Sequence, residues 1–110
     1  MFNFNKNRKA WLITINNEKL SLKDLSKFIE SLEHFKYAIF QREKGEYFQV
    51  SHIQLFIIFS CEKDFTFIRK YFPKAHIEGA NGFYSQCRDY CSKIDTRIEG
   101  PVELGKFIER

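Results

Sequence analysis

A histidine and a glutamine stand two residues apart in the stretch Val50–Phe59, which reads VSHIQLFIIF. Its length and its β-branched and aromatic content predict a strand. Because side chains alternate across a strand, His52 and Gln54 share one face and lie about 7 Å apart. An imidazole and a carboxamide at this spacing can hold a cation, and the same pattern also fits a strand end whose polar groups meet water. The opposite face is apolar and predicts a buried surface formed by Ile53, Leu55, Ile57 and Phe59.

An acidic residue precedes this pair at the end of a second predicted strand, Tyr37–Glu43 (YAIFQRE). Alternation places Glu43 on the same face as Tyr37, Ile39 and Gln41. The connection to the next strand is short, polar and contains Gly45. An antiparallel pairing of the two strands would therefore bring Glu43 next to His52 and Gln54.

A tyrosine and a lysine occupy one face of a helix that we expect over roughly residues 83–93. The spacing of Gln86, Tyr90 and Lys93 matches a helical stripe that points away from the core, with Lys93 one turn beyond Tyr90. An exposed tyrosine beside a lysine is also common without any function. The stripe expected to be buried consists of Phe83, Tyr84, Cys87, Cys91 and Ile94.

The remaining segments complete a β-α-β-β-α-β-α-β order. They are a strand over Ala10–Asn16, a helix capped by Ser21, a short helix capped by Asp64, an extended piece over His76–Glu78 and a last strand over Thr96–Glu99 that ends at Gly100-Pro101. This order predicts an α+β fold with a mostly antiparallel central sheet and helices packed on one face. The other sheet face would stay partly open and carry the candidate metal site.

The composition indicates a single globular domain over residues 1–110. Hydrophobic residues make up 44% of the chain and charged residues 29%, and the net charge of +4 favours polyanionic partners mildly. Residues 1–9 form a flexible basic arm in this interpretation, with Lys6, Arg8 and Lys9 available for phosphate contacts. We find neither a signal-peptide pattern nor an apolar stretch of 18 residues, so no membrane partner is expected.

Three cysteines, Cys61, Cys87 and Cys91, show no disulfide pattern, which indicates a reducing, intracellular compartment. Cys87 and Cys91 together with His76 offer three zinc-ligand types. Their helical spacing and the missing fourth ligand favour small buried residues instead.

Three segments occur in the order and rough spacing of a known motif set: Trp11–Asn17 (WLITINN), His52-Ile53-Gln54 and Tyr90-Cys91-Ser92-Lys93. With them, over about residues 10–105, the chain resembles the replication-initiator (Rep) proteins of small circular single-stranded DNA viruses, especially the circovirus-like and nanovirus-like branch. These are HUH endonucleases, and in this branch Gln replaces the second His of the metal motif. The segment HIEGA from His76 also resembles theirs, whereas Leu55 stands where they often carry Gly.

This resemblance implies specific roles. His52, Gln54 and Glu43 would bind a divalent metal, Mg²⁺ or Mn²⁺, with Glu46 as the alternative acidic ligand. Tyr90 would be the nucleophile and Lys93 its partner. Trp11, Thr14 and Asn16 would help to recognise DNA.

The implied reaction is nicking and rejoining of single-stranded DNA at a replication-origin stem-loop, through a 5′-phosphotyrosine link. Family members usually carry a downstream helicase domain, which this sequence lacks, and self-association is expected only of a full-length protein. The localisation would be the host nucleus for a eukaryotic virus or the cytoplasm for a bacterial replicon. Two alternatives remain open: a non-catalytic module of RNA-recognition (RRM) type that binds single strands on its sheet, and a non-catalytic interaction domain.

Overall fold

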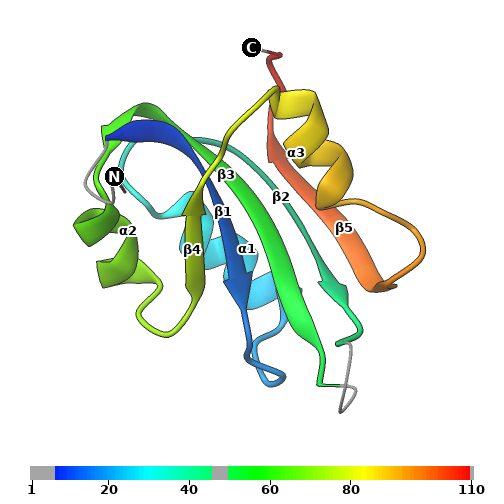
Figure 1. Cartoon of the computed structure of the whole chain (residues 1–110). Coiled ribbons are helices and arrows are strands. Elements are labelled where there is room, and N and C mark those ends of the chain that lie inside the picture. The colour runs from blue at the N-terminus through cyan, green and yellow to red at the C-terminus, as the bar shows by residue number, and fades with distance from the viewer. Residues whose placement is uncertain (1–6, 46–49, 110) are drawn as a thin grey trace, which may run out of the picture.

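A computed structural model describes residues 7–45 and 50–109 of the chain. Its elements follow the predicted order (Figure 1). They are β1 (Arg8–Ile15), α1 (Leu22–Glu30), β2 (Phe35–Glu43), β3 (His52–Lys63), α2 (Phe65–Tyr71), β4 (His76–Gly79), α3 (Tyr84–Tyr90) and β5 (Arg97–Gly105). The α+β class is therefore confirmed.

The five strands form one sheet in the order β4-β1-β3-β2-β5, and every neighbouring pair is antiparallel. β3 lies in the middle, as expected of the most apolar stretch. Its register sets Glu43 opposite His52 and Gln41 opposite Gln54. The predicted pairing of the second strand with the His52 strand is thus confirmed.

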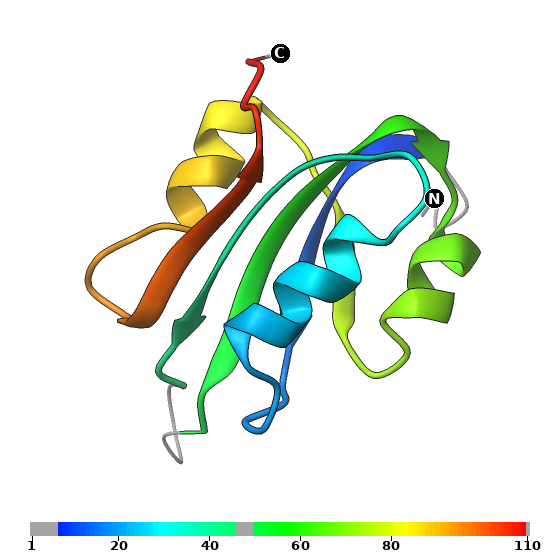
Figure 2. The ribbon, with the colours of Figure 1, turned by 180° about the vertical axis from the view of Figure 1, so that it is seen from behind.

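Two helices cover one sheet face and the third covers part of the other. α1 and α2 pack behind the sheet as drawn in Figure 1 and lie in front of it in Figure 2, whereas α3 lies on the opposite face beside β2 and β5. The expectation of helices on one face therefore holds for α1 and α2 but not for α3, whose Cys87 and Cys91 need a second apolar surface for burial.

The two faces have separate cores. Odd-numbered β3 residues, Trp11 and Ile13 of β1, and the apolar side of α1 form the larger core. The helices that build it begin at the predicted caps, because Ser21 Oγ accepts from the Asp24 N–H at 3.0 Å and Asp64 Oδ1 accepts from the Phe67 N–H at 2.8 Å. The smaller core, under α3, comprises Ala10, Tyr37, Ile39, Phe56, Ile58, Cys87 and Cys91.

Three boundaries differ from the sequence expectation. Arg8 and Lys9 belong to β1 and not to a loose arm. The third helix ends at Tyr90, so Phe83 and Ile94 lie outside it and are 62% and 81% exposed instead of buried. The last strand continues past Gly100-Pro101 to Gly105.

The Gly100-Pro101 pair interrupts the ladder of β5 without ending the strand. Proline removes a backbone donor, which an edge strand tolerates because it has a partner on one side only. The register with β2 shifts between Phe40 and Arg42, and Gly100 takes φ 99° at this irregularity. A local bulge therefore explains why a turn signal lies inside a strand.

No helix in the described part of the chain is long and apolar enough to cross a membrane.

The positions of the cysteines predict their reactivity. Cys87 and Cys91 are buried under α3, whereas Cys61 is partly exposed. Burial raises the pKa of the Cys91 thiol, and the nearby Glu43 carboxylate raises it further. At neutral pH we expect iodoacetamide to modify Cys91 at least about tenfold more slowly than Cys61, as peptide mass spectrometry will show. Equal rates for Cys61 and Cys91 would contradict the packing of α3 on the sheet.

Candidate metal and nucleophile site

A buried carboxylate lies at the end of β2. Glu43 is 2% exposed, and its Oε1 atom lies 3.3 Å from Nε2 of His52 on the adjoining strand β3. The cross-strand pairing brings these side chains to the same face of the sheet. The sequence prediction that Glu43 lies beside His52 is confirmed.

A lysine from beyond α3 approaches the same oxygen. Nζ of Lys93 lies 3.2 Å from Glu43 Oε1. Glu43 thus shares one carboxylate oxygen between an imidazole of β3 and an ammonium group of the segment after α3. An ion pair with one nearly buried member is screened by solvent far less than a surface pair.

Gln54 lies two residues after His52 on β3, and its side chain is on the same face of the sheet. Its Oε1 atom accepts a hydrogen bond from Thr14 Oγ1 at 3.1 Å, and its Nε2 atom donates to the Ile13 carbonyl at 3.5 Å. The register that pairs Thr14 with Gln54 explains these contacts. Thr14 therefore orients the carboxamide, a role that its assignment as a DNA-contacting residue did not include.

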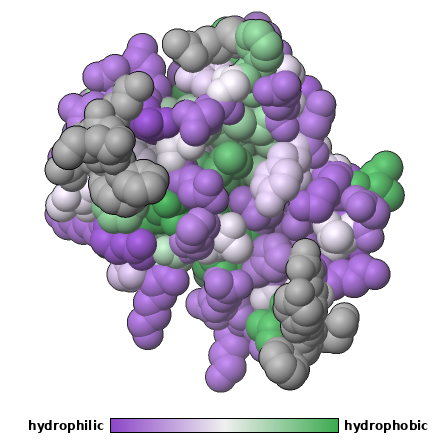
Figure 3. Space-filling view, in the orientation of Figure 1, coloured by the Kyte–Doolittle hydropathy of each residue, from purple (hydrophilic) through white to green (hydrophobic). Residues whose placement is uncertain are grey.

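Tyr90 is the last residue of α3 and is 51% exposed. Nζ of Lys93 lies 4.2 Å from the centre of its ring, a cation–π distance. Tyr90 also lines a cavity of about 230 Å³ together with Gln54, Thr14, Leu12 and Glu78. The structure thus brings the predicted nucleophile, its lysine and all three predicted metal ligands to one sheet face. In the space-filling view of this face, hydrophilic side chains form most of the rim and apolar atoms appear towards its middle (Figure 3).

One pair of donor atoms has the spacing of neighbouring ligands on a divalent ion. Adjacent ligands of an octahedral Mg²⁺ or Mn²⁺ stand about 3 Å apart when each is about 2.1 Å from the ion, and Glu43 Oε1 and His52 Nε2 are 3.3 Å apart. Within residues 7–45 and 50–109 no three His, Cys, Asp or Glu side chains gather into a metal cluster. A set of three protein ligands here would therefore need the side-chain oxygen of Gln54, and Glu46 lies outside the described residues.

The predicted DNA-contacting residues lie in different parts of the structure. Trp11 is 2% exposed in the larger core, and its indole donates to the Arg8 carbonyl, so its side chain packs inside the protein and not on the surface. Alternation explains this, because Trp11 and Thr14 lie on opposite faces of β1. Arg8 and Lys9 line a polar cavity of about 430 Å³ near Asn81, and Lys6 lies outside the described residues.

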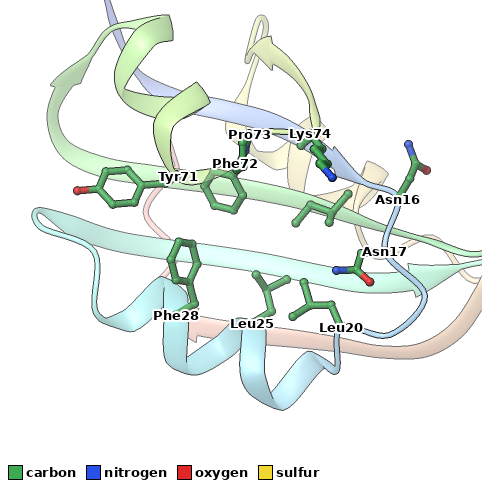
Figure 4. A pocket seen from close by; sticks show the side chains of 11 residues that line it. Asn16, Asn17, Leu20, Leu25, Phe28, Tyr71, Phe72, Pro73 and Lys74 are labelled. Atoms are coloured by element: carbon green, nitrogen blue, oxygen red, sulfur yellow. The ribbon is translucent and has the colours of Figure 1, made fainter.

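Asn16 lies at the mouth of a different cavity, of about 440 Å³, between α1 and α2 (Figure 4). Its walls are largely apolar and include Leu25, Phe28 and Phe72. This cavity opens on the sheet face opposite to Glu43 and Tyr90. The structure therefore does not bring Asn16 together with the predicted catalytic set.

A second ionic cluster holds α3 to β5. Arg88 Nε lies 2.9 Å from Glu103 Oε2 and Arg88 Nη2 lies 3.3 Å from Oε1, while the hydroxyl of Tyr37 donates to the same carboxylate. The Arg88 guanidinium also stacks 4.8 Å from the ring centre of Phe107. These contacts, which sequence reasoning missed, fix the helix that ends at Tyr90.

The cluster perturbs two titrations in opposite directions. Burial raises the pKa of Tyr37, and the hydrogen bond to Glu103 raises it further. The hydrogen bond from Tyr37 lowers the pKa of Glu103, and the bond from Arg88 lowers it further. The folded protein therefore favours a neutral phenol against an ionised carboxylate.

Comparison with known proteins gives consistent similarities. Residues 8–94 match the model of a family described as "Putative viral replication protein". The master replication protein of Milk vetch dwarf virus is 37% identical over 101 residues, which is 90% of this chain and 32% of that protein. The master replication protein of Banana bunchy top virus is 34% identical over 98 residues, or 89% of this chain and 32% of that protein.

An animal-virus protein shows the same likeness. The replication-associated protein of Beak and feather disease virus is 36% identical over 98 residues, which is 87% of this chain and 31% of that protein. The chain thus spans about a third of the length of these relatives.

Tyr37 provides a pH-dependent test of the α3 attachment. Folded Tyr37 keeps its proton above about pH 10, where an unfolded tyrosine loses it, so the unfolded state binds fewer protons and stability falls as pH rises. Tyr37→Phe removes this contribution and, at neutral pH, costs about 1–2 kcal/mol through the lost hydrogen bond to Glu103. Urea unfolding at about pH 8 and about pH 11 should show a smaller alkaline loss in the variant. Equal alkaline losses would show that Tyr37 ionises alike in both states.

Proposed function

The chain belongs to the viral replication protein family, and from this membership and the site geometry we propose that it initiates rolling-circle replication by nicking single-stranded DNA. The resemblance to replication initiators that the motifs indicated is confirmed at the level of the family. The nicking reaction, its metal and its DNA substrate are the content of the proposal. Its main support is the placement of Tyr90 beside Lys93, which contacts the Glu43 carboxylate next to His52.

In the proposed reaction the Tyr90 phenol oxygen attacks the phosphorus of the scissile phosphodiester. The new bond is a phosphotyrosine at the 5′ end, and the bond that breaks joins phosphorus to the 3′-oxygen. The phenol loses its proton, and the leaving 3′-oxygen takes up a proton to become a hydroxyl. Because one phosphoester replaces another, the reverse attack by a 3′-hydroxyl can rejoin strands without a nucleotide cofactor.

Residues of this chain supply most of what the step requires. Lys93 places a positive charge against the Tyr90 ring, where it attracts phosphate and would offset negative charge on the phosphoryl oxygens. Glu43, His52 and Gln54 would hold a Mg²⁺ or Mn²⁺ ion. Such an ion, when bound, polarises the phosphate and stabilises charge on its oxygens. The half-exposed position of Tyr90 leaves it open to a strand from solvent.

The substrate would be single-stranded at the cut, as in an origin stem-loop. The cavity beside Tyr90 has a volume of only about 230 Å³, and a paired backbone would not enter so small a site. Arg8 and Lys9 line the polar cavity at the other end of β1, and their positive charges would contact phosphates of the strand.

The alternative of an RRM-like binding module has less support. Such modules present exposed aromatic rings on the central strands for stacking with bases. Here the aromatic residues of β2 and β3 that face α3, Tyr37 and Phe56, are fully buried beneath that helix and the Phe107 ring. Among the described residues, the part of this face that α3 leaves uncovered carries the partly exposed His52 above the buried Glu43, and the exposed ring beside it is that of Tyr90, the proposed nucleophile.

The nucleophile is tested by substitution of one oxygen atom. Tyr90→Phe should reduce the covalent protein–DNA adduct by at least about a thousandfold while DNA affinity changes less than about threefold, because only the phenol oxygen is lost. The measurement incubates protein with labelled single-stranded origin DNA and Mn²⁺, followed by denaturing electrophoresis. Tyr71→Phe, on the opposite face, is the matched control. Adduct at the normal rate in Tyr90→Phe would eliminate Tyr90 as the nucleophile.

The proposed metal ligands are tested by metal dependence. His52→Ala removes the single nitrogen ligand and should weaken Mn²⁺ binding by at least about tenfold, with a corresponding rise in the Mn²⁺ concentration needed for half-maximal adduct formation. Isothermal titration of the DNA-free protein measures the affinity directly. An unchanged Mn²⁺ affinity would remove His52 from the ligand set.

A further inference from the structure

Gln41 is a fully buried polar side chain near the end of β2, two residues before Glu43 and on the same face of the sheet. Its Nε2 atom donates to Glu43 Oε2 at 2.8 Å and to the Lys93 carbonyl at 2.8 Å. Its Oε1 atom accepts from Arg97 Nε at 2.9 Å. Both amide hydrogens and the carbonyl oxygen therefore have partners, which fixes the orientation of the carboxamide.

Arg97, the first residue of β5, extends this connection. Its Nη2 atom donates to the Ser92 carbonyl at 2.6 Å, while its Nε atom donates to Gln41. Gln41 and Arg97 thus hold two consecutive carbonyls, of Ser92 and Lys93, in the segment that follows Tyr90. The same carboxamide holds the carboxylate oxygen of Glu43 that faces away from His52 and Lys93.

We propose that Gln41 and Arg97 are positioning residues that lock the Glu43 carboxylate and the segment after Tyr90 into one hydrogen-bonded unit. This inference rests on the proposed function of Glu43 as a metal ligand and of Tyr90 as the nucleophile. In this unit the carboxylate keeps Oε1 directed at His52 and Lys93 because Gln41 occupies Oε2. Movement of the Tyr90–Lys93 segment away from the metal ligands requires the Gln41 and Arg97 hydrogen bonds to break.

Gln41 and Glu43 are buried, so the loss of a hydrogen bond between the groups of this unit costs free energy. A polar group that loses its partner inside a protein cannot regain water, so removal of Gln41 leaves the Glu43 carboxylate and the Lys93 carbonyl less satisfied. Residues that orient a metal ligand typically change metal affinity by about 10–100-fold when they are substituted. A glutamine that only filled space in β2 would leave metal affinity unchanged.

The test compares Gln41→Leu and Arg97→Met with two other variants. Arg97→Lys retains a charged donor and should restore part of the function. Ile57→Val, in the larger core on the opposite face, is the control for general destabilisation, with an expected loss of about 0.5–1.5 kcal/mol. Thermal unfolding shows how closely the control matches the variants in stability.

Three measurements are made on each variant. Hydrogen exchange of peptides that cover Cys91–Arg97 is followed without metal or DNA, and we expect about tenfold faster exchange in Gln41→Leu and Arg97→Met. Isothermal titration with Mn²⁺ should show affinity reduced by at least about tenfold in Gln41→Leu. The single-turnover rate of adduct formation at saturating Mn²⁺ should fall at least about tenfold, because misplacement of reacting groups persists when the metal is bound.

The outcomes separate this inference from the proposed function. If the unmodified protein binds Mn²⁺ and forms adduct, and Gln41→Leu matches Ile57→Val in all three measurements, the positioning role is wrong. If the unmodified protein forms no adduct, the nicking function is wrong. The link between Glu43 and the segment after Tyr90 is then decided by hydrogen exchange alone, where unchanged protection in Gln41→Leu overturns it.

Discussion

A carboxylate that folding has removed from water requires partners for both of its oxygens, and this requirement organises the functional face of the protein. Glu43 meets it with His52 and Lys93 on Oε1 and with Gln41 on Oε2. These partners come from β3, from the segment after α3 and from β2 itself. Burial of one acidic group therefore couples the centre of the sheet to the helix that carries Tyr90.

The position of α3 depends on apolar packing and on ion pairs with the sheet. A helix of seven residues is too short to be stable alone, so its location depends on tertiary contacts. Cys87 and Cys91 provide apolar packing on the sheet, and Arg88 reaches Glu103 of β5. Beyond the helix, Lys93 forms an ion pair with Glu43 of β2. Apolar contacts therefore stabilise the middle of α3, whereas an ion pair stabilises the residues that follow the helix.

This division of the sheet explains how a small domain combines a stable core with a polar site. The face covered by α1 and α2 is apolar along the whole of β3 up to Phe59. The other face changes from apolar to polar along its strands, from Tyr37, Ile39, Phe56 and Ile58 to Gln41, Glu43, His52 and Gln54. Helix α3 covers the apolar half and leaves Tyr90 at the boundary with the polar half.

Alternation and strand length were sufficient to predict the central part of this arrangement. The side-chain period of two assigned His52, Gln54 and Glu43 to one face, and the short connection predicted the antiparallel pairing that joins them. The same period, applied to β1, separates Trp11 from Thr14, so the motif segment contributes Trp11 to the larger core and Thr14 to the face that carries Gln54.

Long-range partners were less accessible to sequence reasoning. Phe83 and Ile94 extend the apolar period of the third helix, so the sequence predicts a longer helix. In the tertiary structure both side chains are exposed to solvent. Gly100-Pro101 indicated the end of a strand, and only the edge position of β5 makes a bulge possible there. Gln41 offered one signal, as a polar residue on the same strand face as Tyr37 and Ile39, but its contacts to Lys93 and Arg97 depend on packing across more than 50 residues.

The proposed reaction requires Glu43, His52 and Gln54 to form one metal site beside Tyr90. Anomalous diffraction from crystals grown with Mn²⁺ tests it directly. We expect a single strong peak about 2–2.3 Å from Glu43 Oε1, His52 Nε2 and Gln54 Oε1. Well-ordered density for these three side chains with no Mn²⁺ peak between them, or with the peak bound elsewhere, would contradict it.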